Sequence, residues 1–152
     1  MSDTPDEISP DEWPERHLGG AINEINLLIA KLFNRRTREL GVTRAQWQAL
    51  FWLNRRDGLT QTELAELLVI ARPPLGKIVD RLEAEGWVER RPDERDRRVK
   101  RLYVTEKVKP LVEPAQDTMV ELGEEAMRGM DEDQRRTLIR ALMTIRENLG
   151  RL

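Results

Sequence analysis

The sequence contains no cysteine and a single histidine, His17. Without cysteine the chain cannot form a disulfide, a thiolate metal site or a thiol-based redox switch. His17 has no second histidine or cysteine with which to complete a zinc site, so we expect an ordinary surface or packed histidine and neither metal nor cofactor. The chain also lacks a glycine-rich phosphate loop and a nucleophile elbow, which argues against an enzyme.

Aromatic residues and long apolar runs are scarce as well. Aromatic side chains make up 5% of the 152 residues and charged ones 36%, a balance that favours helices with one apolar stripe over a β-sandwich. No apolar run is long enough to span a bilayer and no signal peptide opens the chain, so we predict a cytoplasmic protein without a membrane partner. The length suffices for one domain with a core, or for two small lobes that share helices.

The stretch that begins at Thr60 carries the clearest helical signals. Thr60 and Glu63 are spaced as a reciprocal capping box, which starts one helix. Pro73 and Pro74 fit the first turn of a second helix, where an N–H group would have no acceptor within the helix, and Gly86 fits its end. The predicted buried stripe of this second helix is Leu75, Ile78, Val79 and Leu82. These signals predict two helices joined by a tight turn.

The chain that follows Gly86 is rich in basic residues. Residues 86–101 hold seven basic and four acidic side chains, a net charge of +3 in a chain whose net charge is −2. The pattern predicts two short strands, the first beginning at Trp87 and the second ending at Val104, with a turn at residues 92–95. A basic hairpin beside an exposed helix face is typical of a surface that binds nucleic-acid phosphates.

Two segments of this region resemble the signature of the MarR family of bacterial regulators, and their surroundings are similar to its SlyA-like branch. The segments are residues 82–88 and 96–107. The resemblance implies a mainly α fold with a small β-wing, namely a winged helix-turn-helix whose N- and C-terminal helices form a dimerisation lobe. It also implies that Asp96 shapes the wing and that Arg98 enters the minor groove. The chain differs at Pro74, where the family usually carries serine or threonine.

The exposed face of the second helix and the basic hairpin together form the predicted DNA-binding surface. Arginine and lysine can donate to guanine O6 and N7, and Gly76 has no side chain to hold the helix away from the groove. Asp96 directly precedes Arg97 and Arg98, so it can order the loop and direct an arginine. The residues expected to contact DNA are Arg72, Pro73, Gly76, Lys77, Arg81, Arg95, Asp96, Arg97, Arg98 and Lys100.

The helices outside this lobe carry more apolar surface than a small domain needs for its own core. A helix expected from Arg16 to Leu40 keeps its apolar stripe over about six turns. The last helix repeats Leu138, Leu142 and Ile145 close to a coiled-coil spacing, so we expect a two-fold homodimer. The predicted organisation is a flexible acidic arm at residues 1–15, dimerisation helices at 16–42 and 106–152, and a DNA-binding lobe at 43–105.

Trp47 lies on the apolar stripe of a helix that Thr43 and Gln46 are spaced to cap. A small aromatic effector stacks well on an indole, and the resemblance places Trp47 at a position that lines a ligand cavity in SlyA-like proteins. A tryptophan on such a stripe is more often part of the core. Both interpretations stay open at this point.

These features together predict a sequence-specific, double-stranded DNA-binding transcriptional regulator. We expect a repressor that binds an inverted repeat as a homodimer and responds to a small aromatic or phenolic ligand. The alternative is a winged-helix protein–protein adaptor without sequence-specific DNA binding, because a fold does not by itself determine function.

Overall fold

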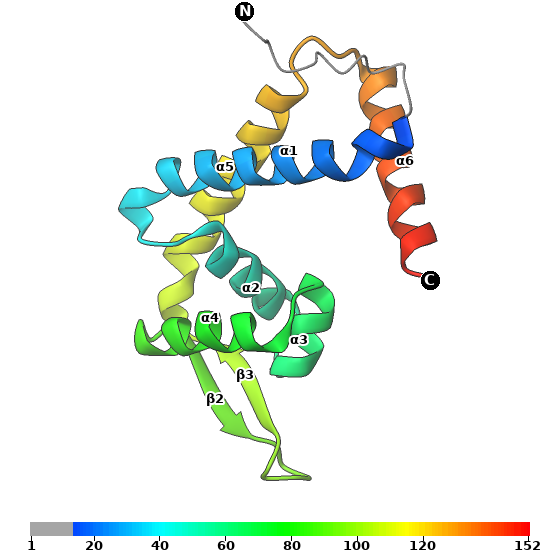
Figure 1. Ribbon diagram of the computed structural model, residues 1–152. Coiled ribbons are helices and arrows are strands. Elements are labelled where there is room, and N and C mark those ends of the chain that lie inside the picture. The colour runs from blue at the N-terminus through cyan, green and yellow to red at the C-terminus, as the bar shows by residue number, and fades with distance from the viewer. Residues whose placement is uncertain (1–13) are drawn as a thin grey trace, which may run out of the picture. The chain divides into compact units, whose positions relative to one another are not determined.

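The computed structural model describes residues 14–152, and it is mainly helical with one small sheet, as predicted (Figure 1). The acidic arm expected at residues 1–15 lies almost wholly outside the described residues. The elements are α1 (Pro14–Arg36), η1 (Arg38–Leu40), α2 (Arg44–Arg55), β1 (Leu59–Thr60), α3 (Gln61–Leu68), α4 (Arg72–Ala84), β2 (Val88–Pro92), β3 (Lys100–Val104), η2 (Glu106–Val108), α5 (Lys109–Ala126) and α6 (Glu132–Leu149).

The chain forms two compact units, one that ends at Thr118 and one that begins at Met119, so the boundary falls within α5. The core of the first unit lies where α2, α3 and α4 meet one another and the sheet. Its fully buried side chains include Leu50, Leu53, Leu64, Leu75, Val79, Leu82, Val88 and Leu102. No helix in the described part of the chain is both long and apolar enough to cross a membrane.

The predicted capping boxes are present. The Thr60 hydroxyl oxygen accepts from the Glu63 backbone N–H at 3.2 Å, and the Glu63 carboxylate accepts from the Thr60 N–H at 2.7 Å. The helices α2 and α6 begin in the same way, with boxes formed by Thr43 with Gln46 and by Asp131 with Gln134. Each box satisfies two N–H groups that would otherwise lack an acceptor, which fixes where the helix starts.

The first helix ends earlier than predicted. It stops at Arg36 rather than near Leu40, and a single 3-10 turn follows. The cause is Thr37, which is fully buried and whose hydroxyl oxygen lies 2.9 Å from the carbonyl oxygens of both Phe33 and Val42. A hydroxyl held between these two carbonyls stabilises a turn here instead of continued helix.

The tight turn between α3 and α4 forms as predicted, but with an unusual backbone. Val69 adopts a left-handed conformation with φ of 52°, which is rare for a β-branched residue. The buried stripe of α4 is narrower than expected, because Ile78 is only half-buried. Gly86 follows α4 with φ of 72°, the left-handed conformation expected at that position.

The sheet has three strands in the order β1-β3-β2, all antiparallel. The short strand β1 was not predicted. Leu59, which directly precedes the capping residue Thr60 in the sequence, pairs with Leu102 of β3. The hairpin turn also lies later than the predicted residues 92–95, because Pro92 still pairs with Lys100. A proline is tolerated there because β2 is an edge strand that needs no further N–H donor.

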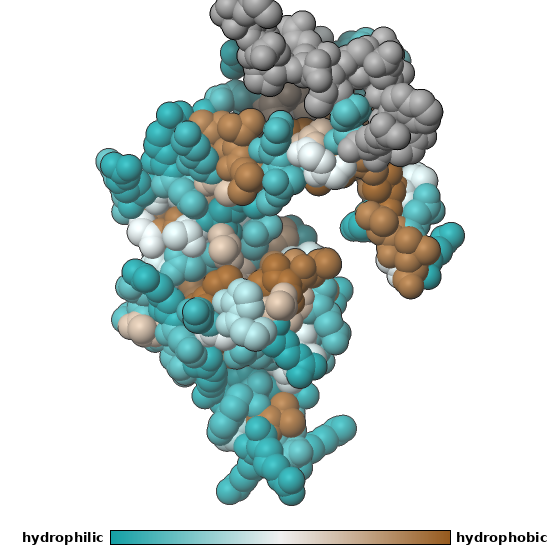
Figure 2. Space-filling view, viewed as in Figure 1, coloured by the Kyte–Doolittle hydropathy of each residue, from teal (hydrophilic) through white to brown (hydrophobic). Residues whose placement is uncertain are grey.

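Most of the exposed large apolar side chains lie on two helices. On α1 they include Leu18, Ile22, Ile25, Leu27 and Leu28, and on α6 they include Leu138, Ile139, Leu142, Met143 and Leu149. Figure 2 shows hydrophobic residues exposed along α6, whereas hydrophilic residues cover most of the end of the β2–β3 hairpin. The 3-10 turn η2 directly precedes α5, and Gly129, with φ of 88°, separates α5 from α6.

Candidate nucleic-acid interface

The helix α4 presents one charged face to solvent. Arg72, Pro73, Lys77 and Arg81 are exposed, as predicted. Gly76 is half-buried on the flank that faces α3, where an added Cβ would lie 3.3 Å from the side-chain nitrogen of Gln61. The missing side chain therefore lets α4 pass close to Gln61. Sequence reasoning did not select Gln61, although the capping box places it at the first position of α3.

Arg90 of β2 is bound to α4. Its guanidinium donates to Asp80 at 2.5 Å and to the carboxylate of Glu83. Burial lowers the pKa of Arg90, but the hydrogen bonds that Arg90 donates to Asp80 and Glu83 outweigh burial and raise that pKa above its usual value. We call these three residues the Arg90 clasp. It compensates one of the two negative charges beside the exposed face of α4 and ties the hairpin to the helix.

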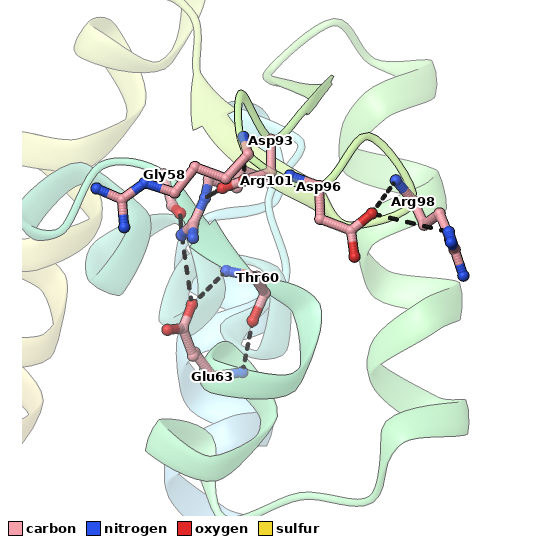
Figure 3. Close-up of polar contacts among 8 residues, drawn as sticks. Gly58, Thr60, Glu63, Asp93, Asp96, Arg98 and Arg101 are labelled. Carbon is pink, nitrogen blue, oxygen red and sulfur yellow. Dashed lines mark hydrogen bonds and ion pairs between the residues drawn. The ribbon is translucent and has the colours of Figure 1, made fainter.

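Arg101 holds the base of the hairpin (Figure 3). Its guanidinium donates to the Gly58 carbonyl at 2.8 Å and to the carboxylate of Asp93, and lies 3.9 Å from Glu63. The hydrogen bond from Arg101, followed by those from two backbone N–H groups, lowers the pKa of Asp93 to about 2. Sequence reasoning missed Asp93 and treated Arg101 only as one more positive charge.

The tip of the hairpin is organised by Asp96. Its carboxylate accepts from the backbone N–H of Arg98 at 3.0 Å and lies 4.0 Å from the Nε of Arg98 (Figure 3). The side chain of Arg98 is 96% exposed. The ordering that we expected of Asp96 is therefore present, and the arginine head group remains in solvent.

The structure divides the seven basic residues of the hairpin region into two groups. Arg90, Arg91 and Arg101 are occupied within the protein, since Arg91 pairs with Glu89 and lies 4.6 Å from the centre of the Tyr103 ring. The other four are exposed, and none forms an ion pair with another described residue except Arg98 with Asp96. This second group, the tip cations, consists of Arg95, Arg97, Arg98 and Lys100.

Trp47 belongs to α2, and its side chain packs towards α1. Its ring packs against Phe33 at 5.5 Å and Phe51 at 5.4 Å between centroids. The Nε1 of Trp47 and the Nε of Arg44 are buried, and neither donates to an atom of the described residues. Burial also lowers the pKa of Arg44, whose terminal nitrogen donates to Asn26 at 2.9 Å.

In this structure a tight turn joins two helices, and the second helix is exposed along one face and followed by a projecting antiparallel hairpin. This arrangement defines a winged helix-turn-helix protein. A sequence model described as the MarR family matches residues 40–99. The uncharacterized HTH-type transcriptional regulator YwoH of Bacillus subtilis (strain 168) is 33% identical over 123 residues, which cover 80% of this chain and 89% of YwoH. The chain belongs to the MarR family of transcriptional regulators.

Solved structures agree with this assignment. The crystal structure of the transcriptional regulator SlyA superimposes with a TM-score of 0.83 at 26% identity, covering 88% of this chain and 94% of SlyA. The transcriptional repressor CouR, bound to a 23-mer DNA duplex, superimposes with a TM-score of 0.77 at 28% identity, covering 92% of this chain and 99% of CouR. The fold and the family expected from residues 82–88 and 96–107 are therefore confirmed.

Proposed function

We propose that this protein is a transcriptional repressor that binds an inverted repeat in double-stranded DNA as a homodimer. The observation that carries the proposal is the group of exposed tip cations on the hairpin that follows helix α4. Among the residues that the structure describes, their one acidic partner is Asp96, which pairs with Arg98. Free cations beside a groove-sized helix are suited to phosphate contact. The likeness to CouR, a DNA-bound repressor, supports the same conclusion.

In this proposal α4 lies in the major groove. Arg72, Lys77 and Arg81 donate to base edges or phosphates. At the wing, Arg98 enters the minor groove with its backbone held by Asp96, so less freedom is lost on binding. The remaining tip cations contact the phosphates on either side.

The homodimer is supported by the unburied apolar surface of α1 and α6. Ile25 and Leu28 of α1 are 55% and 58% exposed, and Leu142 of α6 is 40% exposed. Apolar surface of this extent on helices is typical of protein–protein interfaces. A two-fold dimer that buries it would present two copies of α4 to successive major grooves, which matches an inverted repeat.

A small aromatic acid is the ligand class that best fits the surroundings of Trp47. The Nε of Arg44 and the Nε1 of Trp47 have no acceptor among the described residues and would suit a carboxylate, while the indole ring would stack on an aromatic ring. Salicylate and related acids should weaken DNA binding by about 5- to 150-fold, the usual range of coupling between two sites. Trp47→Phe keeps a ring and removes the donor, so it should reduce this response and leave ligand-free DNA binding unchanged.

The proposal is tested by selection of bound duplexes from a random DNA pool, followed by binding measurements at several salt concentrations. We expect enrichment of a two-fold symmetric sequence. If the tip cations of both subunits neutralise phosphates, log K should fall with log salt with a slope on the order of −7. A chain that enriches no sequence and stays monomeric would contradict the proposal and favour the adaptor.

A further inference from the structure

The first turn of α4 is apolar and exposed. It follows a turn in which Val69 is 90% exposed and Ile70 is 37% exposed, and it continues with exposed Ala71, Pro73 and Pro74. We call these five residues the apolar turn. Figure 2 shows hydrophobic residues exposed on the surface near the junction of α3 and α4.

The apolar turn offers little for a phosphate to bind. Helix N-termini usually hold phosphate through free backbone N–H groups, but Pro73 and Pro74 have none. Ala71, the residue that caps α4, makes no side-chain hydrogen bond. Only Arg72 keeps an N–H group among the first three residues of the helix. The usual anion site at the start of this helix is therefore largely missing.

The apolar turn is continuous with the face that the proposed function places in the major groove. Pro73 lies four residues before Lys77, so the two share one side of α4. Both are exposed, and Arg72 flanks them. A groove that accepts Lys77 must also accept the ring of Pro73.

The major groove contains one apolar group that such a surface can recognise, the C5-methyl group of thymine. We propose that the apolar turn recognises thymine methyl groups, with Pro73 as the central contact, and so selects T·A pairs within each half-site. This inference rests on the proposed function and adds its sequence preference. Discrimination at these pairs comes from burial of a methyl group rather than from a hydrogen bond.

The test replaces thymine by deoxyuridine, which lacks only the C5-methyl group, at each position of the selected duplex in turn. At one or two thymines in each half-site the affinity should fall about fourfold, the equivalent of about 0.8 kcal/mol for one buried methyl group. Deoxyuridine in the flanking DNA should have no effect. Uniformly neutral replacements in a duplex that binds would overturn this inference alone, whereas failure to select any duplex would overturn the proposed function as well.

Protein variants assign the contact to the apolar turn. Pro73→Ala removes the outer ring carbons, so the deoxyuridine effect should shrink from about fourfold to less than about twofold at the same thymines. Pro110→Ala is the matched control, because Pro110 is also exposed in the first turn of a helix, α5. It should leave the fourfold effect unchanged. An equal deoxyuridine effect in wild type and Pro73→Ala would overturn the assignment.

Discussion

Removal of the Arg90 clasp should affect both the stability of the protein and its affinity for DNA. Arg90→Met keeps the length and apolar stem of the side chain but deletes the guanidinium. Asp80 and Glu83 would then keep their negative charges on α4 with no bound cation. The hairpin would also lose its polar attachment to the helix, while the β2–β3 ladder stays intact.

The loss of stability can be estimated from the exposure of the three side chains in the clasp. The side chain of Arg90 is 23% exposed, whereas those of Asp80 and Glu83 are 69% and 42% exposed. The pairs therefore resemble surface ion pairs more closely than deeply buried ones. A surface ion pair contributes up to about 1 kcal/mol to stability. We expect the free energy of unfolding to fall by about 1–2 kcal/mol, which lowers Tm by about 2–8 °C in a chain of this size.

The loss of DNA affinity follows from the change in charge. Two unit charges separated by about 10 Å of water repel by about 0.4 kcal/mol before screening. The loss of one positive charge near several phosphates should therefore cost on the order of 0.5–1 kcal/mol at low salt, or about two- to fivefold in affinity. The effect should fade at high salt, because the groups are exposed.

The double variant Arg90→Met with Asp80→Asn distinguishes two explanations for weaker DNA binding. One is the change in net charge, and the other is the loss of a direct phosphate contact by Arg90. The net charge of the clasp in the double variant equals that of the wild type, although the hydrogen bonds are absent. DNA affinity, measured by fluorescence anisotropy, should return close to the wild-type value, while the midpoint of urea unfolding stays low. The compensation argument is refuted if the double variant binds DNA as weakly as Arg90→Met alone.

Three further predictions follow from the site and the helices. Arg98→Ala should weaken binding to all sequences and reduce the salt slope by about two units, one for each subunit of the dimer, and an unchanged slope would exclude phosphate or groove contact by Arg98. The pKa of Asp93 is lowered from 3.8 to about 2, so its contribution to stability is present above pH 4 and is lost as pH falls from about 4 to 2. Urea unfolding across this range should depend less on pH in Asp93→Asn, and equal dependence would contradict the prediction. Ile25→Glu and Leu142→Glu should each favour the monomer in analytical ultracentrifugation, and a dimer of unchanged stability in both variants would reject α1 and α6 as the interface.

Several features could be predicted because they depend on neighbours close in the sequence. The Thr60–Glu63 capping box joins residues three positions apart. Gly86 adopts a left-handed conformation at the end of α4 because glycine has no Cβ atom to oppose it. The buried stripe of α4 follows from helical periodicity. Asp96 was correctly expected to order the tip, because its partner Arg98 is two residues away.

Other features depend on partners that are distant in the sequence, and only the fold brings those together. Arg101 donates to Gly58, which is 43 residues away, and Leu59 becomes a strand only because Leu102 lies beside it. Seven cations in the hairpin region look alike in the sequence, yet the structure neutralises Arg90 and Arg101 and leaves the tip cations exposed. Local hydrogen bonds and periodicity thus determined the helices, and the resemblance of residues 82–88 and 96–107 indicated the family. Which charges remain available to DNA was decided by tertiary structure, because an ion pair forms only where folding brings the opposite charge within reach.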